Sequence, residues 1–90
     1  MYTLDFDPKV VKVMAKRKKS NHNLFKKLGN ILGAIQEDPR KGIGHPEPLV
    51  GGNGITYSRR ITAHDRIIYD IYDEEVHVLI IELEGHYDDK

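Results

Sequence analysis

Polar side chains that could act on a phosphate ester are spaced along the second half of the sequence. Glu47 lies between two prolines, and Arg60 and Arg66 fall on or beside adjacent predicted strands. His86 and Tyr87 follow directly after the last predicted strand. A carboxylate, guanidinium groups and a terminal His-Tyr pair together indicate phosphoryl chemistry.

RNA is a substrate that such groups can cleave, because it carries its own nucleophile, the 2′-hydroxyl. Cleavage needs a base to remove the hydroxyl proton, cations for the crowded phosphate and an acid for the leaving 5′-oxygen. Glu, Arg and His side chains fill these roles without a metal ion. The same residues also fit structural roles, since Glu47 could cap a turn and a terminal histidine is commonly only solvated.

Arg59 directly precedes Arg60 on the same predicted strand. Strand alternation places the two side chains on opposite faces of the sheet, so we expect only one to line a concave surface. Arg59 is a second candidate for substrate binding beside Arg60, through a surface phosphate contact, and a structural role is its alternative.

Two pairs of residues have spacings compatible with metal binding, His45 with Glu47 and His64 with His86. The sequence has no motif of the CxxC or HExxH type, in which ligand spacing itself indicates a metal. We therefore expect no metal site and no cofactor.

The composition is that of a globular chain, with 39% hydrophobic and 31% charged residues among 90. A chain this short builds one compact core, so we expect one domain over residues 1–90. The lack of cysteine excludes a disulfide framework and thiolate chemistry. With no signal-peptide pattern and no apolar stretch of membrane-spanning length, we expect a cytoplasmic protein.

The net charge of zero hides a split between the two halves of the chain. Residues 1–45 hold ten Lys or Arg against four Asp or Glu, and residues 46–90 hold four against ten. The basic half includes the run Lys16-Arg17-Lys18-Lys19. The run could bind phosphates or an acidic partner, or it could be a solvated helix face.

The first half of the chain has the pattern of one strand and two helices. Residues 1–6 alternate as a strand does, and Asp7-Pro8 is suited to begin a helix. Ser20-Asn21-His22-Asn23 is a break, and Asp38-Pro39 ends the second helix. Because the break is short, the helices are expected to pair antiparallel. The second helix carries an apolar stripe at helical spacing, Leu24, Leu28, Ile31 and Ile35.

The second half begins with a loop rich in glycine and proline over residues 40–54, with a short extended piece at residues 46–49. Three strands are predicted after it, over residues 55–61, 66–72 and 76–83. Their short connections favour antiparallel neighbours. The expected architecture is α+β, with an N-terminal strand, an antiparallel helix pair and an antiparallel meander that carries the helices on one face.

Four segments of the second half resemble a known family. The segments are Gly42-Ile43-Gly44-His45-Pro46-Glu47-Pro48-Leu49, Tyr57-Ser58-Arg59-Arg60-Ile61-Thr62, His64-Asp65-Arg66-Ile67-Ile68-Tyr69 and His86-Tyr87. In this order and spacing they resemble the YoeB/Txe toxins of the RelE-like superfamily, found in type II toxin–antitoxin modules. The resemblance is specific over residues 42–87, whereas over residues 1–41 only the strand–helix–helix layout agrees. It implies the RelE-like, or microbial RNase-like, fold.

The resemblance also implies a toxin that cuts messenger RNA in the ribosomal A site. The family's catalytic glutamate falls on Glu47, its transition-state arginine on Arg66 and a second arginine on Arg60. Its terminal pair falls on His86 and Tyr87. The chemistry then assigns Glu47 as general base, His86 as general acid and the two arginines to the phosphate, and Tyr87 would stack on or orient a base.

The sequence departs from the family at two places near these motifs. Val50 stands where many relatives carry a basic residue. Before the His-Tyr pair, where relatives are often basic or neutral, this chain has Glu82-Leu83-Glu84-Gly85. Strand parity places both glutamates on the side of His86, so we expect them to keep it protonated.

The partners implied by the resemblance are a cognate YefM-like antitoxin, the ribosome with its message, and a second copy of the chain. Operator DNA would be bound only through the antitoxin, and no membrane is involved. The alternative from another class is a non-catalytic RelE-like binding protein, either of the gyrase-poisoning type or an antitoxin-bound scaffold. Such relatives lack the Glu and His constellation, so Glu47 with His86-Tyr87 favours the enzyme. A ribosome-independent nuclease is a third interpretation, for which the second half offers few cations.

Overall fold

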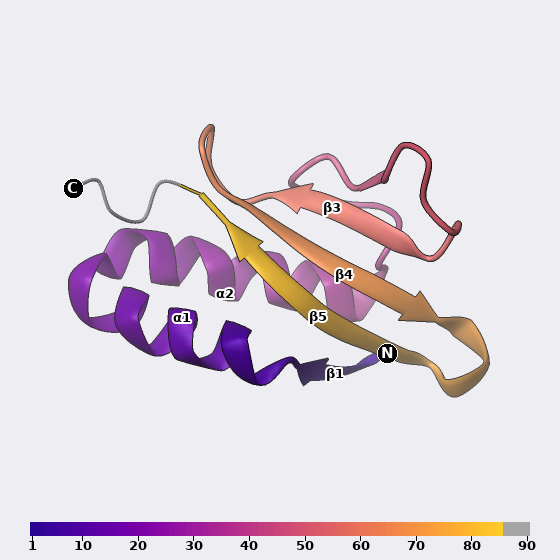
Figure 1. The fold of residues 1–90 in the computed structure, drawn as a ribbon, viewed down its shortest axis with the longest axis horizontal. Helices are drawn as coiled ribbons and strands as arrows, with labels where there is room; N and C mark the ends of the chain where they lie inside the picture. The colour runs from indigo at the N-terminus through magenta and orange to yellow at the C-terminus, as the bar shows by residue number, and fades with distance from the viewer. Residues whose placement is uncertain (86–90) are drawn as a thin grey trace.

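The computed structural model describes residues 1–85 of the chain (Figure 1). His86 and Tyr87, which were predicted as site residues, lie outside the described residues. The elements follow in the order β1 (Thr3–Phe6), α1 (Pro8–Ser20), α2 (His22–Glu37), β2 (Glu47–Pro48), β3 (Thr56–Arg60), β4 (Arg66–Tyr72), the 3₁₀ turn η1 (Asp73–Glu75) and β5 (His77–Glu84).

The strands of the described segment form one sheet in the order β1-β5-β4-β3-β2. β3, β4 and β5 are antiparallel neighbours, which confirms the predicted meander. β1 pairs with β5 in parallel, so the sheet is mixed. Figure 1 shows the two helices running antiparallel to each other along one face of the sheet. The α+β architecture expected from the sequence is therefore confirmed.

Both helices begin at capping residues. The carboxylate of Asp7 accepts a hydrogen bond from the backbone N–H of Lys9 at 2.9 Å, and Pro8 occupies the first turn of α1. The side chain of Asn21 accepts the N–H of Leu24 at 3.1 Å and starts α2. The predicted four-residue break is thus reduced to Asn21 alone, because α1 continues through Ser20. No helix within residues 1–85 is long and apolar enough to cross a membrane.

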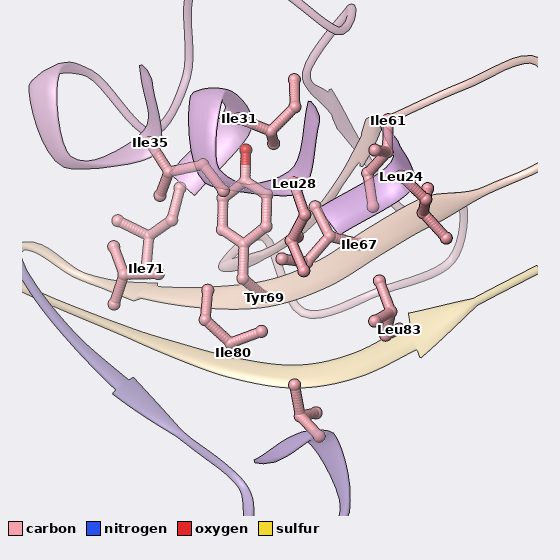
Figure 2. Close-up of a cluster of buried hydrophobic side chains, with 12 residues drawn as sticks. Leu24, Leu28, Ile31, Ile35, Ile61, Ile67, Tyr69, Ile71, Ile80 and Leu83 are labelled. Carbon is pink, nitrogen blue, oxygen red and sulfur yellow. The ribbon is translucent and has the colours of Figure 1, made fainter. Parts of the chain in front are cut away.

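The core lies between the α2 stripe and the inner face of β4 and β5 (Figure 2). All four residues of the predicted stripe are buried, at 5% exposure or less. Figure 2 shows them facing the strand side chains across the helix–sheet interface. On the sheet side the cluster consists of Ile61, which directly follows β3, and the strand residues Ile67, Tyr69, Ile71, Val78, Ile80 and Leu83.

A bulge in β5 changes which side chains face the core near the end of the strand. Tyr69 pairs with Ile80 and Ile68 with Glu82, so Ile81 is the extra residue. The inward positions therefore shift from Val78 and Ile80 to Leu83. As a result, Glu82 and Glu84 both lie on the face away from the core.

Tyr69 joins the sheet to the loop that follows α2. Its ring is fully buried, and its hydroxyl donates to the backbone carbonyl of Pro39 at 2.6 Å. Burial raises the pKa of Tyr69 to about 12, although the positive charge of Arg59 opposes this shift. Between pH 10 and pH 12 the unfolded chain therefore loses this proton while the folded chain keeps it.

Tyr69→Phe removes the ionisable hydroxyl, so the unfolding free energy of the variant is expected to depend on pH differently from that of wild type. Urea unfolding at a series of pH values measures the difference. At neutral pH the variant should be less stable by about 1–3 kcal/mol, because the Pro39 carbonyl loses its donor. The Tyr69 contribution is complete below pH 10 and is lost as the pH rises through 12, so the difference in unfolding free energy should shift by about 2–3 kcal/mol in favour of the variant, enough to close the gap or reverse its sign. A gap that stays constant from pH 7 to pH 12 would contradict the burial of the neutral phenol.

Candidate functional site

A pocket of about 460 Å³ opens where β3 ends, β4 begins and β5 ends. It brings together three of the predicted site residues, Glu47, Arg60 and Arg66, which come from β2, β3 and β4. All three side chains belong to exposed residues. The lining residues are His45, Glu47, Ser58, Arg60, Thr62, Ala63, His64, Asp65, Arg66, Glu84 and Gly85.

Glu47 is positioned by a two-residue edge strand. It pairs with Ser58 of β3, and the N–H of Leu49 donates to the carbonyl of Thr56 at 3.0 Å. The flanking prolines restrict the backbone on both sides, and a proline in a sheet is confined to such an edge. The carboxylate is therefore held at the rim of the pocket by backbone pairing and by restricted torsions.

Gly44 brings the loop before Glu47 close to β3. Its carbonyl accepts the N–H of Arg60 at 2.6 Å, and its φ of +88° suits glycine. A side chain at this position would collide with the carbonyl of Arg60 and with Cγ of Arg59. The glycine in the Gly-His-Pro-Glu segment therefore permits the close approach that carries Glu47 to the pocket.

Arg59 does not contact the pocket, which corrects its prediction as a substrate-binding residue. Its side chain is fully buried on the core face, and Nη2 donates to the carbonyls of Asp38 at 2.9 Å and Lys41 at 2.6 Å. The prediction that Arg59 and Arg60 lie on opposite faces of the sheet is confirmed. Arg59, however, has the structural role that was its alternative, because it supports the loop after α2. Residues 57, 59 and 61 share one face of the strand, and the apolar side chains of Tyr57 and Ile61 were the available signal that this face points to the core.

Arg60, Arg66 and Glu84 form a row across three neighbouring strands. Arg60 lies directly opposite Arg66, and Arg66 lies directly opposite Glu84. Nε of Arg66 donates to Oε1 of Glu84 at 2.9 Å. This ion pair was not predicted from the sequence, which indicated only that Glu84 shares a side with His86, because the pair depends on the register between β4 and β5.

Asp65 is a pocket residue that was not predicted from the sequence. The hydroxyl of Thr62 donates to its Oδ2 at 2.5 Å, and its own N–H donates back to that hydroxyl at 3.1 Å. Its other carboxylate oxygen lies against Gly85, where a Cβ atom would collide with it. The Thr-x-x-Asp spacing between two strands is typical of a side-chain-capped turn and was the available signal.

The charges that line the described part of the pocket are not those of a simple cationic groove. Two guanidinium groups, from Arg60 and Arg66, meet three carboxylates, from Glu47, Asp65 and Glu84. Gly85 also lines the pocket, and His86 is the next residue in the sequence. The placement of His86 and Tyr87, and the tuning of His86 by Glu82 and Glu84, stay predictions.

This arrangement of side chains is chemically suited to phosphoryl chemistry, in which a proton is removed beside a bound phosphate. An exposed carboxylate can accept a proton, and two adjacent guanidinium groups can bind a phosphate through several N–H donors. Within residues 1–85, no three His, Asp or Glu side chains cluster as a metal site would require.

Comparison with protein families gives a match over residues 6–87, to the YoeB-like toxin of bacterial type II toxin–antitoxin systems. The chain belongs to this family. The match includes the pocket residues and extends through the His86-Tyr87 pair. The toxin RelK of Mycobacterium tuberculosis is 34% identical over 79 residues, which cover 88% of this chain and 93% of that protein.

Solved structures of YoeB toxins share the fold. The YoeB dimer of Staphylococcus aureus superposes with a TM-score of 0.81 at 28% identity, covering 96% of this chain and 98% of that one. The YoeB–YefM complex of the same species gives 0.78 at 28% identity, covering 97% and 99%. The isolated Escherichia coli RelE toxin gives 0.74 at 24% identity, covering 100% and 89%, which shows the RelE-like fold.

Proposed function

We propose that this YoeB-family toxin is an endoribonuclease that cleaves messenger RNA in the ribosomal A site and so inhibits translation. The observation that carries the proposal is the pocket in which Glu47, Arg60 and Arg66 meet from three different strands. Membership of the family supports the same conclusion, because these residues lie in the motifs through which the sequence resembles its relatives.

The reaction that these groups support is attack of the 2′-hydroxyl on the adjacent phosphate. Glu47 takes the hydroxyl proton, and Arg60 and Arg66 stabilise the charge that develops on the phosphate oxygens. His86 donates a proton to the leaving 5′-oxygen, and Tyr87 stacks on or orients a base. The bond from phosphorus to the 5′-oxygen breaks as the bond to the 2′-oxygen forms, so the reaction needs no oxidant and no cofactor.

We further propose a cognate YefM-like antitoxin as the partner that restrains the toxin. The S. aureus relative forms a YoeB–YefM complex, and another structure of that toxin is a dimer. By likeness this chain would bind its antitoxin, form a dimer with a second copy, and meet operator DNA only through the antitoxin. Its site of action would be the cytoplasm, where ribosomes translate messages.

Translation of one defined message in a purified system tests the function directly. Cleavage is mapped by primer extension with wild-type toxin, with Glu47→Gln, and with message alone in the absence of ribosomes. The expected result is cutting at A-site codons that requires both ribosomes and Glu47. Growth arrest on expression without any cut message would instead favour the non-catalytic binding protein, and cutting of free RNA would favour a ribosome-independent nuclease.

Metal removal is expected to leave cleavage intact, because side chains fill the acid, base and cation roles. Ribosomes need magnesium, so the assay adds chelators selective for transition metals at a fixed magnesium concentration. The measured quantity is the single-turnover rate of message cleavage. Loss of cutting that zinc or manganese restores would rule out the metal-free mechanism.

The basic end of α1 is expected to contribute to ribosome binding. Lys16, Lys18 and Lys19 are exposed there, and Nζ of Lys18 lies 5.9 Å from the centre of the Phe25 ring. Reversal of the three lysines to Glu should weaken binding and reduce the slope of its salt dependence by about one for each phosphate that the lysines neutralise. Unchanged affinity at several salt concentrations would identify the run as a solvated helix face.

A further inference from the structure

We propose that Glu84 is a positioning residue for Arg66 and that its charge limits the affinity of the pocket for RNA. The inference rests on the proposed function, because it concerns the same pocket.

The row of side chains across the sheet places Glu84 where it can act on Arg66. Arg60 and Arg66 are directly opposite each other on β3 and β4, and like charges in this arrangement repel. Glu84 is directly opposite Arg66 on the other side and supplies the compensating charge. The carboxylate therefore holds the Arg66 guanidinium toward β5, while Arg60 and Arg66 both line the pocket.

The atom through which the ion pair is made determines how Arg66 is oriented. Glu84 accepts a hydrogen bond from Nε of Arg66, and within residues 1–85 the two Nη nitrogens make no hydrogen bond. A guanidinium has five N–H donors in a fixed plane, so anchoring Nε fixes the direction of the other four. The end of Arg66 that can bind two phosphate oxygens is thereby oriented, and no residue of the described part of the chain competes for it.

The ion pair is open to solvent. The side chains of Arg66 and Glu84 are 52% and 38% exposed, and a pair this open to water adds little to stability. The contact is therefore better suited to orienting a functional group than to holding the fold. The negative charge of Glu84 also repels the phosphates of RNA. With Glu47 and Asp65 it makes three carboxylates in the described lining, against the two guanidinium groups of the arginines.

Two substitutions separate the orientation from the charge. Glu84→Gln keeps an oxygen that can accept from Nε of Arg66 but removes the negative charge, whereas Glu84→Ala removes both. Glu74→Gln is the control for the loss of one negative charge, because Glu74 is an exposed carboxylate of η1 that does not line this pocket. Each protein is assayed in single turnover on ribosomes carrying one defined message, at increasing toxin concentration.

Both variants at Glu84 are expected to reach half-saturation at lower toxin concentration, by about three- to tenfold, the scale of one charge interaction near a protein surface. Glu84→Gln should keep the wild-type maximal rate when the assay is run at a pH low enough for the general acid His86 to be protonated in both proteins. Glu84→Ala should lower that rate by about two- to fivefold, the scale of one exposed ion pair, because Arg66 is no longer held in a productive geometry. The Glu74 control should change neither quantity.

An activity-independent measurement accompanies the assay. The ¹⁵N-resolved NMR signal of the Arg66 Nε–H should be protected from solvent exchange in wild type and in Glu84→Gln, and lost in Glu84→Ala. A protected signal in Glu84→Ala, or a wild-type maximal rate for that variant, overturns the positioning role. Unchanged half-saturation in both variants overturns the effect of charge. If the wild-type protein cuts no message, the proposed function fails, and the NMR result still decides whether Glu84 positions Arg66.

Discussion

Glu47→Gln is expected to reduce the single-turnover rate of message cleavage by about 10²–10⁴-fold, the usual contribution of a general acid or base. The amide cannot take the proton of the 2′-hydroxyl, although it has nearly the shape of the carboxylate. The pocket keeps Arg60 and Arg66, so binding of the message should survive. The rate is measured on programmed ribosomes with saturating toxin, and binding is measured separately by co-sedimentation.

The position of Glu47 makes this substitution a clean test. The residue is exposed on β2, and it is held there by backbone pairing with Ser58, which a side-chain change does not remove. The melting temperature should therefore equal that of wild type. If Glu47→Gln cleaves at the wild-type rate, the carboxylate is not the base, and a structural role for Glu47 at the turn becomes the better interpretation.

The second large effect is expected in the core, where Leu28→Ala should lower the free energy of unfolding by about 2–5 kcal/mol. Leu28 is 2% exposed and lies in the middle of the α2 stripe that packs on the sheet. Truncation removes apolar contacts and leaves a cavity that the helix and sheet cannot fully close. Urea unfolding at neutral pH measures the difference between the two proteins.

Val11→Ala on α1 is the matched control for this prediction. Val11 is 49% exposed, and substitutions at such positions usually change stability by less than about 0.5 kcal/mol. A similarly small loss for Leu28→Ala would show that α2 does not pack on the sheet as described.

The two helices could be predicted from the sequence because their signals are local, although the break between them is shorter than predicted. The stripe from Leu24 to Ile35 repeats at the period of a helix, and Asp7 and Asn21 are capping residues within one turn of the groups they satisfy. The parallel pairing of β1 with β5 has no such local signal. It depends on contacts between residues that are more than seventy positions apart, such as Thr3 and His77.

The candidate site could be predicted only in part for the same reason. Alternation correctly separated Arg59 from Arg60, and the apolar residues Tyr57 and Ile61, which share the face of Arg59, could have identified it as the inward residue. The contact of Arg66 with Glu84 depends on the register of β4 against β5 after the bulge at Ile81. Spacing along the chain carries no information about either register or bulge, so these contacts could not be derived from it.

The contact between Asp65 and Gly85 makes two distant positions interdependent. The carboxylate that closes the turn between β3 and β4 occupies the space that any side chain at position 85 would need. Replacement of Gly85 by any larger residue therefore requires Asp65 to move or to be replaced, whereas a smaller residue at position 65 leaves Gly85 undisturbed. The substitutions that position 85 tolerates thus depend on the residue at position 65.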